Sequence, residues 1–165
     1  MHTVIFDIND GLFDTLAFKD EIIEVNAKNI TAPCQGCFKC WLKNAGYCFM
    51  KDSLQHIGAA IGTSDKITII SELCYGGYSS SIKRVMDRSI GLSIPFFTYR
   101  ERKTHHIKRY NHSHQMLRVY FYGKGSKLEK ETAKELVKMN SINMGVEETE
   151  ITFADIADEL RGRVL

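Results

Sequence analysis

Residues 66–90, KITIISELCYGGYSSSIKRVMDRSI, contain a strand pattern, a loop pattern and a helix pattern in that order. Residues 66–71 form an apolar run rich in β-branched side chains, which predicts a buried strand. A loop rich in glycine and hydroxyl groups follows, and residues 79–90 then repeat apolar side chains at helical spacing. Strand, loop and helix in this order form the repeating unit of parallel sheets, so this stretch decides the fold class.

The same unit recurs along the rest of the chain. We expect strands over residues 3–8, 22–25, 116–122 and 150–153, and helices over residues 52–61 and 126–142. Ser126 is positioned to cap the last helix, and Glu129 stands three residues further on. Five strands alternating with helices predict an α/β fold, a three-layer α/β/α sandwich around a five-stranded parallel sheet. The 165 residues fit a single domain, residues 1–165.

The first connection is short for a fold of this kind. Only residues 9–20 separate the first two strands, which is close to the minimum of about twelve residues for a parallel crossover. A shortened crossover helix of two turns or fewer fits there. Asp10-Gly11 could instead form a hairpin turn and give an antiparallel start. We favour the short helix, because right-handed crossovers dominate such folds.

The composition is that of an ordinary globular protein, with 44% hydrophobic and 25% charged residues. No apolar run is long enough to span a bilayer, and the amino terminus lacks the pattern of a secretory signal. We therefore expect a cytoplasmic protein without a membrane partner. The net charge of +2 does not indicate nucleic-acid binding. Positive charge is concentrated in residues 100–114, within an irregular stretch, residues 91–115, that we expect over an active site or at a subunit contact.

Four of the five cysteines form the pattern Cys34-x2-Cys37-x2-Cys40-x7-Cys48. In a reducing compartment such a cluster points away from a disulfide framework. Four thiolates at these spacings could hold an iron–sulfur cluster, or zinc, although the third close cysteine fits zinc less well. The thiols could also form a redox disulfide, or pack a tight loop without any ion. The fifth, Cys74, is either redox-active or a small buried apolar side chain.

Ligands of open parallel sheets bind beyond the carboxyl ends of the strands. Three loops follow strands at that edge: residues 7–11, 72–81 and 123–126. The last two are rich in glycine and hydroxyl groups, which allow backbone amides to approach a ligand closely. These loops are the first candidates for a binding site.

Three stretches of the chain now form a recognisable set: PCQGCFKCW at residues 33–41, GYCFMKD at 46–52, and the Ser71-x4-Gly76-Gly77-Tyr78-Ser79-x3-Lys83-x3-Asp87-Arg88 pattern. In order and spacing they resemble the flavodoxin-like NAD(P)H-dependent FMN reductase family, including its iron–sulfur flavoprotein branch. The resemblance implies a flavodoxin-like fold, FMN as cofactor, and a homodimer or higher homo-oligomer. It also implies electron transfer from a reduced nicotinamide or another donor.

The resemblance further implies where the flavin binds. The loop after the third strand would lie against the isoalloxazine ring, with the backbone amides of Gly76 and Gly77 near the flavin carbonyls and Tyr75 or Tyr78 over the ring. The flavin chemistry requires no catalytic side chain. The resemblance does not settle whether the cysteines hold a metal, because many relatives that look like simple flavoproteins carry a similar cysteine pattern. The candidate cofactor-binding residues are then Ser71, Cys74, Tyr75, Gly76, Gly77, Tyr78 and Ser79, and the candidate metal ligands are Cys34, Cys37, Cys40 and Cys48.

Two features depart from the family pattern. Asp7, Asp10 and Asp14 stand where the family has a Gly-Ser-rich loop for the FMN phosphate, and carboxylates repel a phosphate. Glu72 and Cys74 stand where the family has a proline and an aromatic residue. Charge for the phosphate could come from basic residues of the same or a neighbouring subunit, namely Arg100, Arg102, Lys108 and Arg109.

These departures leave a second functional hypothesis open. The chain could be a non-enzymatic flavodoxin-like domain with a degenerate flavin site, acting as an electron carrier, a metal-binding protein or an interaction module. The stretch VIFDINDG, residues 4–11, also looks like the start of a haloacid-dehalogenase-type phosphatase. That motif needs its second carboxylate two residues after the first, whereas Asp10 follows Asp7 by three.

Overall fold

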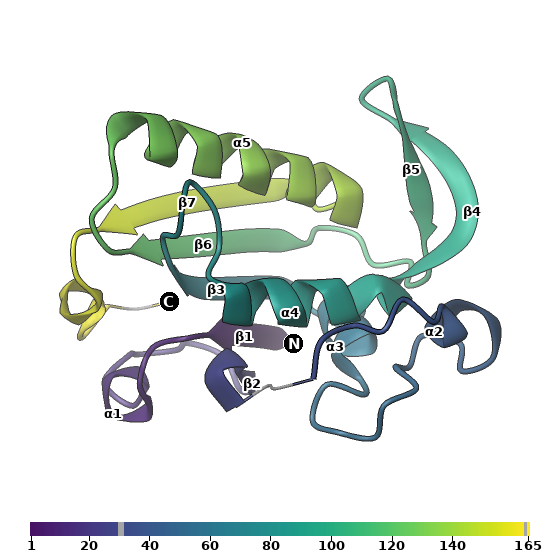
Figure 1. Cartoon of the computed structure of the whole chain (residues 1–165), viewed down its shortest axis with the longest axis horizontal. Coiled ribbons are helices and arrows are strands. Elements are labelled where there is room, and N and C mark those ends of the chain that lie inside the picture. Colours follow the sequence, from purple (N-terminus) through teal and green to yellow (C-terminus); the bar gives the residue numbers. More distant parts are fainter. Residues whose placement is uncertain (30–31, 164) are drawn as a thin grey trace.

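The computed structural model describes residues 1–29, 32–163 and 165 (Figure 1). Within these residues, five parallel strands form one sheet in the order β2-β1-β3-β6-β7. Its strands are β1 (His2–Phe6), β2 (Ile22–Asn26), β3 (Lys66–Glu72), β6 (Met116–Tyr122) and β7 (Glu148–Ala154). With β4 and β5 outside the sheet, this is the strand order of the flavodoxin-like fold. The predicted parallel sheet is confirmed.

The short first crossover is also confirmed. β1 pairs with β2 in parallel, from His2 opposite Ile22 to Phe6 opposite Asn26, so the hairpin alternative is wrong. The connecting helix α1 (Asp10–Phe13) has four residues. The Asn9 side chain caps it by accepting a hydrogen bond from the Leu12 amide at 2.7 Å. Asp10 and Gly11 therefore lie inside a helical turn rather than in a hairpin.

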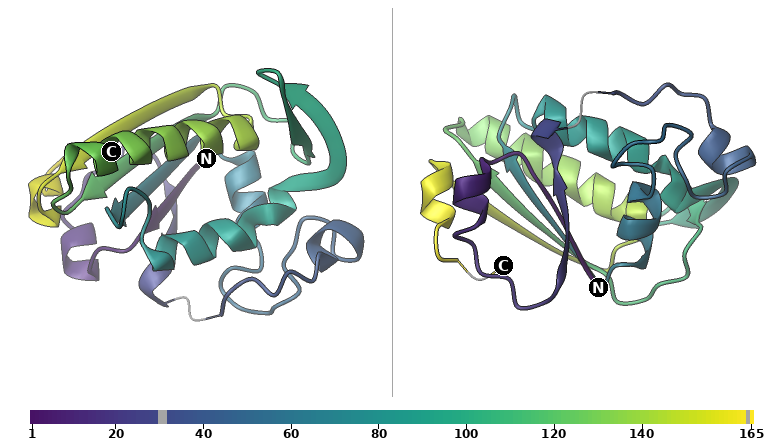
Figure 2. Two further views of the ribbon diagram at one scale, coloured as in Figure 1. Left: turned by 45° about the horizontal axis from the view of Figure 1, so that its top comes forward. Right: turned by 90° about the horizontal axis from the view of Figure 1, so that it is seen from below.

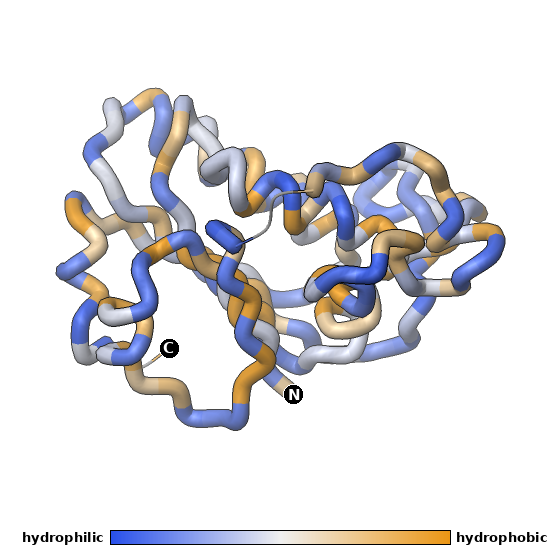
Figure 3. Tube along the Cα trace, turned by 60° about the horizontal axis from the view of Figure 1, so that its bottom comes forward, coloured by the Kyte–Doolittle hydropathy of each residue, from blue (hydrophilic) through white to orange (hydrophobic). Residues whose placement is uncertain are grey.

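Three longer helices pack on one face of the sheet (Figure 2). They are α3 (Ile57–Thr63), α4 (Ser80–Arg88) and α5 (Lys127–Met144). α5 begins with the predicted capping box of Ser126 and Glu129. α3 begins five residues later than predicted, because the Asp52 side chain accepts from the Leu54 amide and holds a turn there. Their apolar sides and the strands form the main core, and the strands carry much of the hydrophobic sequence (Figure 3).

The opposite face is covered by small elements. α1 and the single turn η3 (Ala157–Leu160) lie together beside the carboxyl ends of the strands (Figure 2). Leu12, Phe13 and Leu160 pack there against Val4 and Phe6 of β1. The Phe6 and Phe13 rings stack at 3.8 Å between centroids. The fold is thus a three-layer sandwich with one thin layer.

The stretch 91–115 is more regular than the sequence suggested. After the short turn η2 (Ser89–Leu92), β4 (Ser93–Arg100) and β5 (Lys103–Lys108) form an antiparallel hairpin outside the main sheet. The two residues of its turn, Glu101 and Arg102, both have positive φ, at 45° and 63°. Such turns usually carry glycine or asparagine, so the sequence lacked the ordinary hairpin signal.

The basic residues of this hairpin bind the end of α5. Arg100 Nη2 donates to the carbonyls of His106 at 2.9 Å and Asn143 at 3.0 Å, and Lys108 Nζ donates to Gly145 at 3.1 Å. Cations are favourable at a helix carboxyl terminus, where carbonyls lack partners. Figure 1 shows the hairpin at the end of the molecule opposite the carboxyl ends of the sheet. The positive charges of Arg100 and Lys108 therefore stabilise the carboxyl-terminal end of α5.

A buried histidine begins the first strand. His2 Nε2 lies 2.9 Å from Thr68 Oγ1, in the interior of the sheet. Burial, helped by the positive charge of Lys66, lowers the pKa of His2 from 6.5 to about 4. The folded protein thus keeps this imidazole neutral at a pH at which the unfolded chain would protonate it.

We therefore expect the fold to lose stability as the pH falls from about 6.5 toward 4, because only the unfolded state takes up the proton. The loss between about pH 7 and about pH 5.5 should be about 1 kcal/mol. Urea unfolding at several pH values measures it. His2→Gln should remove this part of the pH dependence, and the exposed control His114→Gln should keep it. Equal slopes in wild type and His2→Gln would contradict the assignment.

Candidate functional site

The loop edge predicted to bind the flavin begins at Asp7, directly after β1. The Asp7 side chain is buried, and its two oxygens accept from the Glu72 amide at 3.1 and 3.2 Å. The Tyr122 hydroxyl donates to Asp7 Oδ1 at 3.0 Å. Burial, together with the Asp7 carboxylate, raises the pKa of Tyr122 far above its usual range. A carboxylate of the protein itself thus ties the ends of β1, β3 and β6 together.

Groups of the protein itself also bind the amino terminus of α1. The Asn9 side chain takes the Leu12 amide, and the Asn9 carbonyl takes the Phe13 amide at 3.0 Å. Asp10 Oδ1 accepts from Asn26 Nδ2 at 2.7 Å, which places a second carboxylate at the start of the helix. Two amides of the first turn, those of Leu12 and Phe13, are thus used, and the charge beside them is negative.

The loop after β3 closes on itself. Cys74 and Gly77 exchange two backbone hydrogen bonds, of 2.9 and 3.0 Å, around Tyr75 and Gly76. Both central residues have positive φ, 50° and 74°, as a type I′ turn requires. The Tyr75 side chain is 98% exposed at the tip of this turn. Burial raises the pKa of the Cys74 thiol beside it.

The turn packs against α5 and leaves no room for larger side chains. A Cβ on Gly76 would lie 2.9 Å from Thr132 Cβ, and one on Gly77 would lie 3.1 Å from Leu136 Cδ2. Figure 1 shows this loop rising from β3 across the sheet toward α5. The packing on a helix accounts for the glycine pair without a cofactor.

The remaining residues of the predicted flavin set are structural in this arrangement. Ser71 Oγ accepts from the Ser79 amide at 2.9 Å, and Ser79 Oγ caps α4 through the Ile82 amide at 3.3 Å. The Tyr78 ring is buried and stacks on Phe121, with centroids 5.4 Å apart. Burial raises the pKa of Tyr78 to about 12. Of the two tyrosines considered as ring covers, Tyr75 alone lies at the surface.

These observations bear on how FMN could bind at the carboxyl edge of the sheet. Asp7 and Asp10 stand where the resemblance places the phosphate, and carboxylates disfavour a phosphate beside them. Arg100 and Lys108 bind the carboxyl-terminal end of α5 at the opposite end of the molecule, so within one subunit they do not reach this edge. The loop amides that donate to protein oxygens are those of Glu72, Leu73, Cys74, Gly77 and Ser79.

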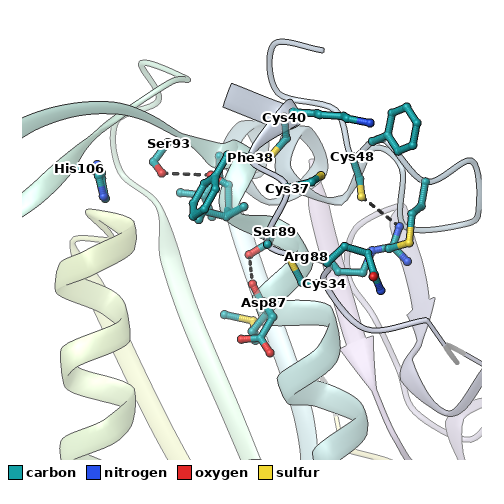
Figure 4. A pocket seen from close by; sticks show the side chains of 18 of the residues that line it. Cys34, Cys37, Phe38, Cys40, Cys48, Asp87, Arg88, Ser89, Ser93 and His106 are labelled. Carbon is teal, nitrogen blue, oxygen red and sulfur yellow. Dashed lines mark hydrogen bonds between the residues drawn. The ribbon is translucent and has the colours of Figure 1, made fainter. Parts of the chain in front are cut away.

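The cysteines gather at the opposite end of the molecule, around a cavity of about 850 Å³. We call it the cysteine cavity. Its walls are residues 34–40 and 48–50, the carboxyl-terminal ends of α4 and α5, and His106 of β5. Figure 4 shows Cys34, Cys37, Cys40 and Cys48 around it. The sequence placed these cysteines after the second strand, but the chain carries them beyond the amino ends of the sheet.

An ion pair with a buried guanidinium group adjoins the cavity. Arg88, in the last turn of α4, is fully buried, and its guanidinium group donates to both Asp52 oxygens, at 2.5 and 2.6 Å. These hydrogen bonds lower the pKa of Asp52. Arg88 Nη2 also lies 3.3 Å from Cys48 Sγ, as the dashed line in Figure 4 marks. Asp52 and Arg88 belong to the motif seen in the sequence, but nothing in the sequence showed that they pair.

The four thiols differ in exposure. Cys34 and Cys37 are exposed, Cys48 is half-buried and Cys40 is buried. Burial, followed by the nearby Cys48, raises the pKa of the Cys40 thiol. In the part of the chain that the structure describes, no three His, Cys, Asp or Glu side chains are arranged to hold a metal ion. The iron–sulfur and zinc hypotheses thus gain no support from the geometry, and the metal ligands stay a prediction.

A row of aromatic rings joins the cavity rim to the hairpin. Centroid distances are 5.2 Å from Phe38 to Trp41, 4.7 Å from Trp41 to His106, and 4.8 Å from His106 to Phe97. Trp41 Nε1 donates to the Ile90 carbonyl at 2.9 Å. Sequence reasoning missed His106, because its partner lies 65 positions away and no local pattern connects them.

Comparisons with known proteins bear on the fold. No family model matches the chain, and no curated protein matches it in sequence. Solved structures do match. An FMN-dependent NADH-azoreductase from Bacillus anthracis, in complex with FMN, has a TM-score of 0.57 at 17% identity, over 95% of this chain and 88% of that one.

Two further structures agree with it. An azoreductase from Bacillus anthracis strain Sterne has a TM-score of 0.59 at 12% identity, covering 96% of this chain and 88% of its own. An NAD(P)H:quinone oxidoreductase from Methanothermobacter marburgensis has a TM-score of 0.57 at 12% identity, and the match covers 98% of this chain and 93% of that one. These likenesses confirm the flavodoxin-like fold of NAD(P)H-dependent FMN reductases. Among the described residues, no helix combines the length and the apolar character needed to cross a membrane.

Proposed function

We propose that this chain is a flavodoxin-like ligand-binding module that works through the cysteine cavity and has no standard FMN site. One observation carries the proposal. The buried Asp7 carboxylate occupies the end of β1 and binds the Glu72 amide, at the edge where the resemblance expects the FMN phosphate. A fixed negative charge there disfavours any phosphorylated ligand.

The cysteine cavity supports the positive part of the proposal. Its volume of about 850 Å³ lies in the range of small-molecule sites. Its lining combines apolar side chains such as Phe38 and Met86 with a few polar groups, including Asn140 and His106. Apolar walls with a few convergent polar groups are typical of binding sites.

A second candidate is an FMN-dependent oxidoreductase that takes electrons from a reduced nicotinamide. The likeness to an FMN-bound azoreductase over nearly the whole chain favours it. For this function the phosphate would need charge from a neighbouring subunit. A homodimer or higher homo-oligomer and a cytoplasmic location are further predictions of this candidate.

A flavin titration separates the two candidates. Protein purified without oxygen should show no flavin absorption bands, and added FMN should bind more weakly than about 0.1 mM. Riboflavin, which lacks the phosphate, should bind no more weakly than FMN, because the phosphate finds no favourable charge. The readouts are visible absorption and the quenching of flavin fluorescence. Stoichiometric FMN in the purified protein, or micromolar FMN binding, would overturn the proposal and favour the oxidoreductase.

A further inference from the structure

We propose that the cysteine cavity takes a flat, uncharged aromatic compound. The inference rests on the proposed function, since it names the class of ligand for the same cavity. The cavity lies beyond the amino ends of the sheet, away from the loops where the resemblance places the flavin. A ligand bound here is therefore distinct from an FMN molecule at the carboxyl edge.

The first argument is the chemistry of the apolar walls. Three of the six methionines of the chain line the cavity, Met50 from a loop, Met86 from α4 and Met144 from α5. Two phenylalanines stand with them, whereas the aliphatic residues of the described lining are Ile90 and Leu92. Methionine sulfur makes favourable contacts with aromatic rings, and rings pack well on one another. These walls thus favour a flat ring system over a saturated one.

The second argument is a ring at the rim that a ligand can reach. Phe38 lines the cavity with 47% of its surface exposed. Its ring is tilted against that of Trp41, with centroids 5.2 Å apart, so the indole supports it from one side. The exposed part of the Phe38 ring is free to pack on a bound ring, which would remove apolar surface of both from water.

The third argument is charge. Outside histidine, the described lining residues with a formal charge are Lys39, Asp87 and Arg88. Asp52 neutralises Arg88, with 2.6 Å between Arg88 Nη2 and Asp52 Oδ1. Lys39 and Asp87 have opposite signs, and the Lys39 ammonium group lies over the Phe49 ring. The walls therefore carry no net charge to offset that of an ionised ligand, and moving such a ligand out of water is unfavourable.

The polar groups of the walls lead to the same class of ligand. Ser89 Oγ and Ser93 Oγ donate to main-chain carbonyls at 2.7 and 3.1 Å, as dashed lines in Figure 4 mark. Asn143 Oδ1 lies 2.8 Å from His105 Nδ1. Because these groups already have partners in the protein, a ligand gains its binding free energy mainly from apolar contact.

Coumarin, a flat and uncharged lactone, tests the proposal by NMR of ¹³C-labelled methionine methyl groups in the full chain. It should bind with a Kd between about 0.1 and 1 mM, as expected for a compound of this size. The signals of Met50, Met86 and Met144 should shift, because the ring current of a bound aromatic acts on nearby methyl groups. The signals of Met1 and Met116, which lie outside the described lining, should stay in place.

Two relatives of coumarin test the two parts of the class. Octahydrocoumarin is the saturated form, and it should bind at least about fivefold more weakly, because it lacks the ring contacts. Coumarin-3-carboxylate keeps the rings and adds a negative charge, and it should bind about tenfold more weakly. Titrations followed on the same methionine signals give the three affinities.

A variant pair tests the ring at the rim. Phe38→Leu keeps an apolar side chain but removes the ring, so it should weaken coumarin binding about threefold. Phe96→Leu is the matched control, since Phe96 lies on β4, is 66% exposed and stands outside the described lining. It should bind coumarin as the wild type does. The methionine spectrum of each free variant shows whether it has kept the fold.

Two results would overturn the proposal. One is a wild-type protein whose three lining methionine signals do not move in coumarin at about 5 mM, well above the expected Kd; this result needs no variant. The other is octahydrocoumarin or coumarin-3-carboxylate binding as tightly as coumarin. The cavity would then take another class of ligand, and the proposed function would stand. Failure of the proposed function appears instead as tight FMN binding in the flavin titration.

Discussion

Replacing Asp7 by alanine is expected to lower the free energy of unfolding by about 4 kcal/mol. The substitution leaves the Glu72 amide and the Tyr122 hydroxyl without their acceptor at a buried position. Each unsatisfied buried group costs about 1–3 kcal/mol, and these hydrogen bonds are to a charged group. Urea unfolding followed by circular dichroism measures the change.

Asp7→Asn is the matched control for this prediction. Its amide oxygen can still accept from Glu72, so the loss should be about 1 kcal/mol. The same variant tests the functional argument, because it removes the negative charge and keeps the shape. FMN binding should improve relative to riboflavin in Asp7→Asn if the carboxylate repels the phosphate. An unchanged ratio of the two affinities would show that Asp7 does not exclude FMN.

The second large effect is expected at the ion pair beside the cysteine cavity. Asp52→Ala leaves the fully buried Arg88 without its carboxylate, and breaking a buried pair costs about 3–5 kcal/mol. Asp52 is 36% exposed, so water can partly replace it, and we expect about 3 kcal/mol. In a double-mutant cycle with Arg88→Met, the double variant should lose less stability than the sum of the single variants. Additive losses would mean that the pair contributes no interaction energy.

The ion pair also predicts a pH dependence. Hydrogen bonds from Arg88 lower the pKa of Asp52 below its ordinary 3.8, so the folded state keeps the carboxylate charged where the unfolded chain takes up a proton. The contribution to stability is therefore complete above pH 3.8 and disappears as the pH falls through the lowered pKa. Acid unfolding of wild type and Asp52→Asn should converge at low pH. A constant difference at all pH values would contradict the assignment.

Local sequence patterns predicted most of the fold. The period of two in the strands, the period of 3.6 in the helices and the capping box at Ser126 each depend on residues within a few positions of one another. The short first crossover followed from the length of the connection, residues 9–20, and from the preference for right-handed crossovers, and α1 with its four residues confirms it. The hairpin β4–β5 escaped prediction, because Glu101 and Arg102 are unusual residues for its turn.

For the candidate sites, the sequence predicted which residues belong to them but not which residues contact one another. The cysteine motif and the adjacent residues Asp87 and Arg88 were visible in the sequence. So was the carboxylate of Asp7 at the position where the family binds a phosphate. The sequence could not show that Arg88 reaches Cys48 and Asp52 across 40 and 36 positions. It could not show that Gly76 and Gly77 pack closely against α5. Each of these contacts depends on how distant segments approach one another.

Local sequence patterns are sufficient for the succession of the five sheet strands and the long helices, since periodicity and capping act over one or two turns of chain. The positions of the candidate sites depend instead on tertiary contacts. The tertiary structure placed the cysteines at the amino ends of the sheet and the glycine loop at the carboxyl ends. The physical reason is that residues 32–56 are held by contacts with distant parts of the chain, such as the hydrogen bonds of Arg88 to Asp52 and of Trp41 to the Ile90 carbonyl.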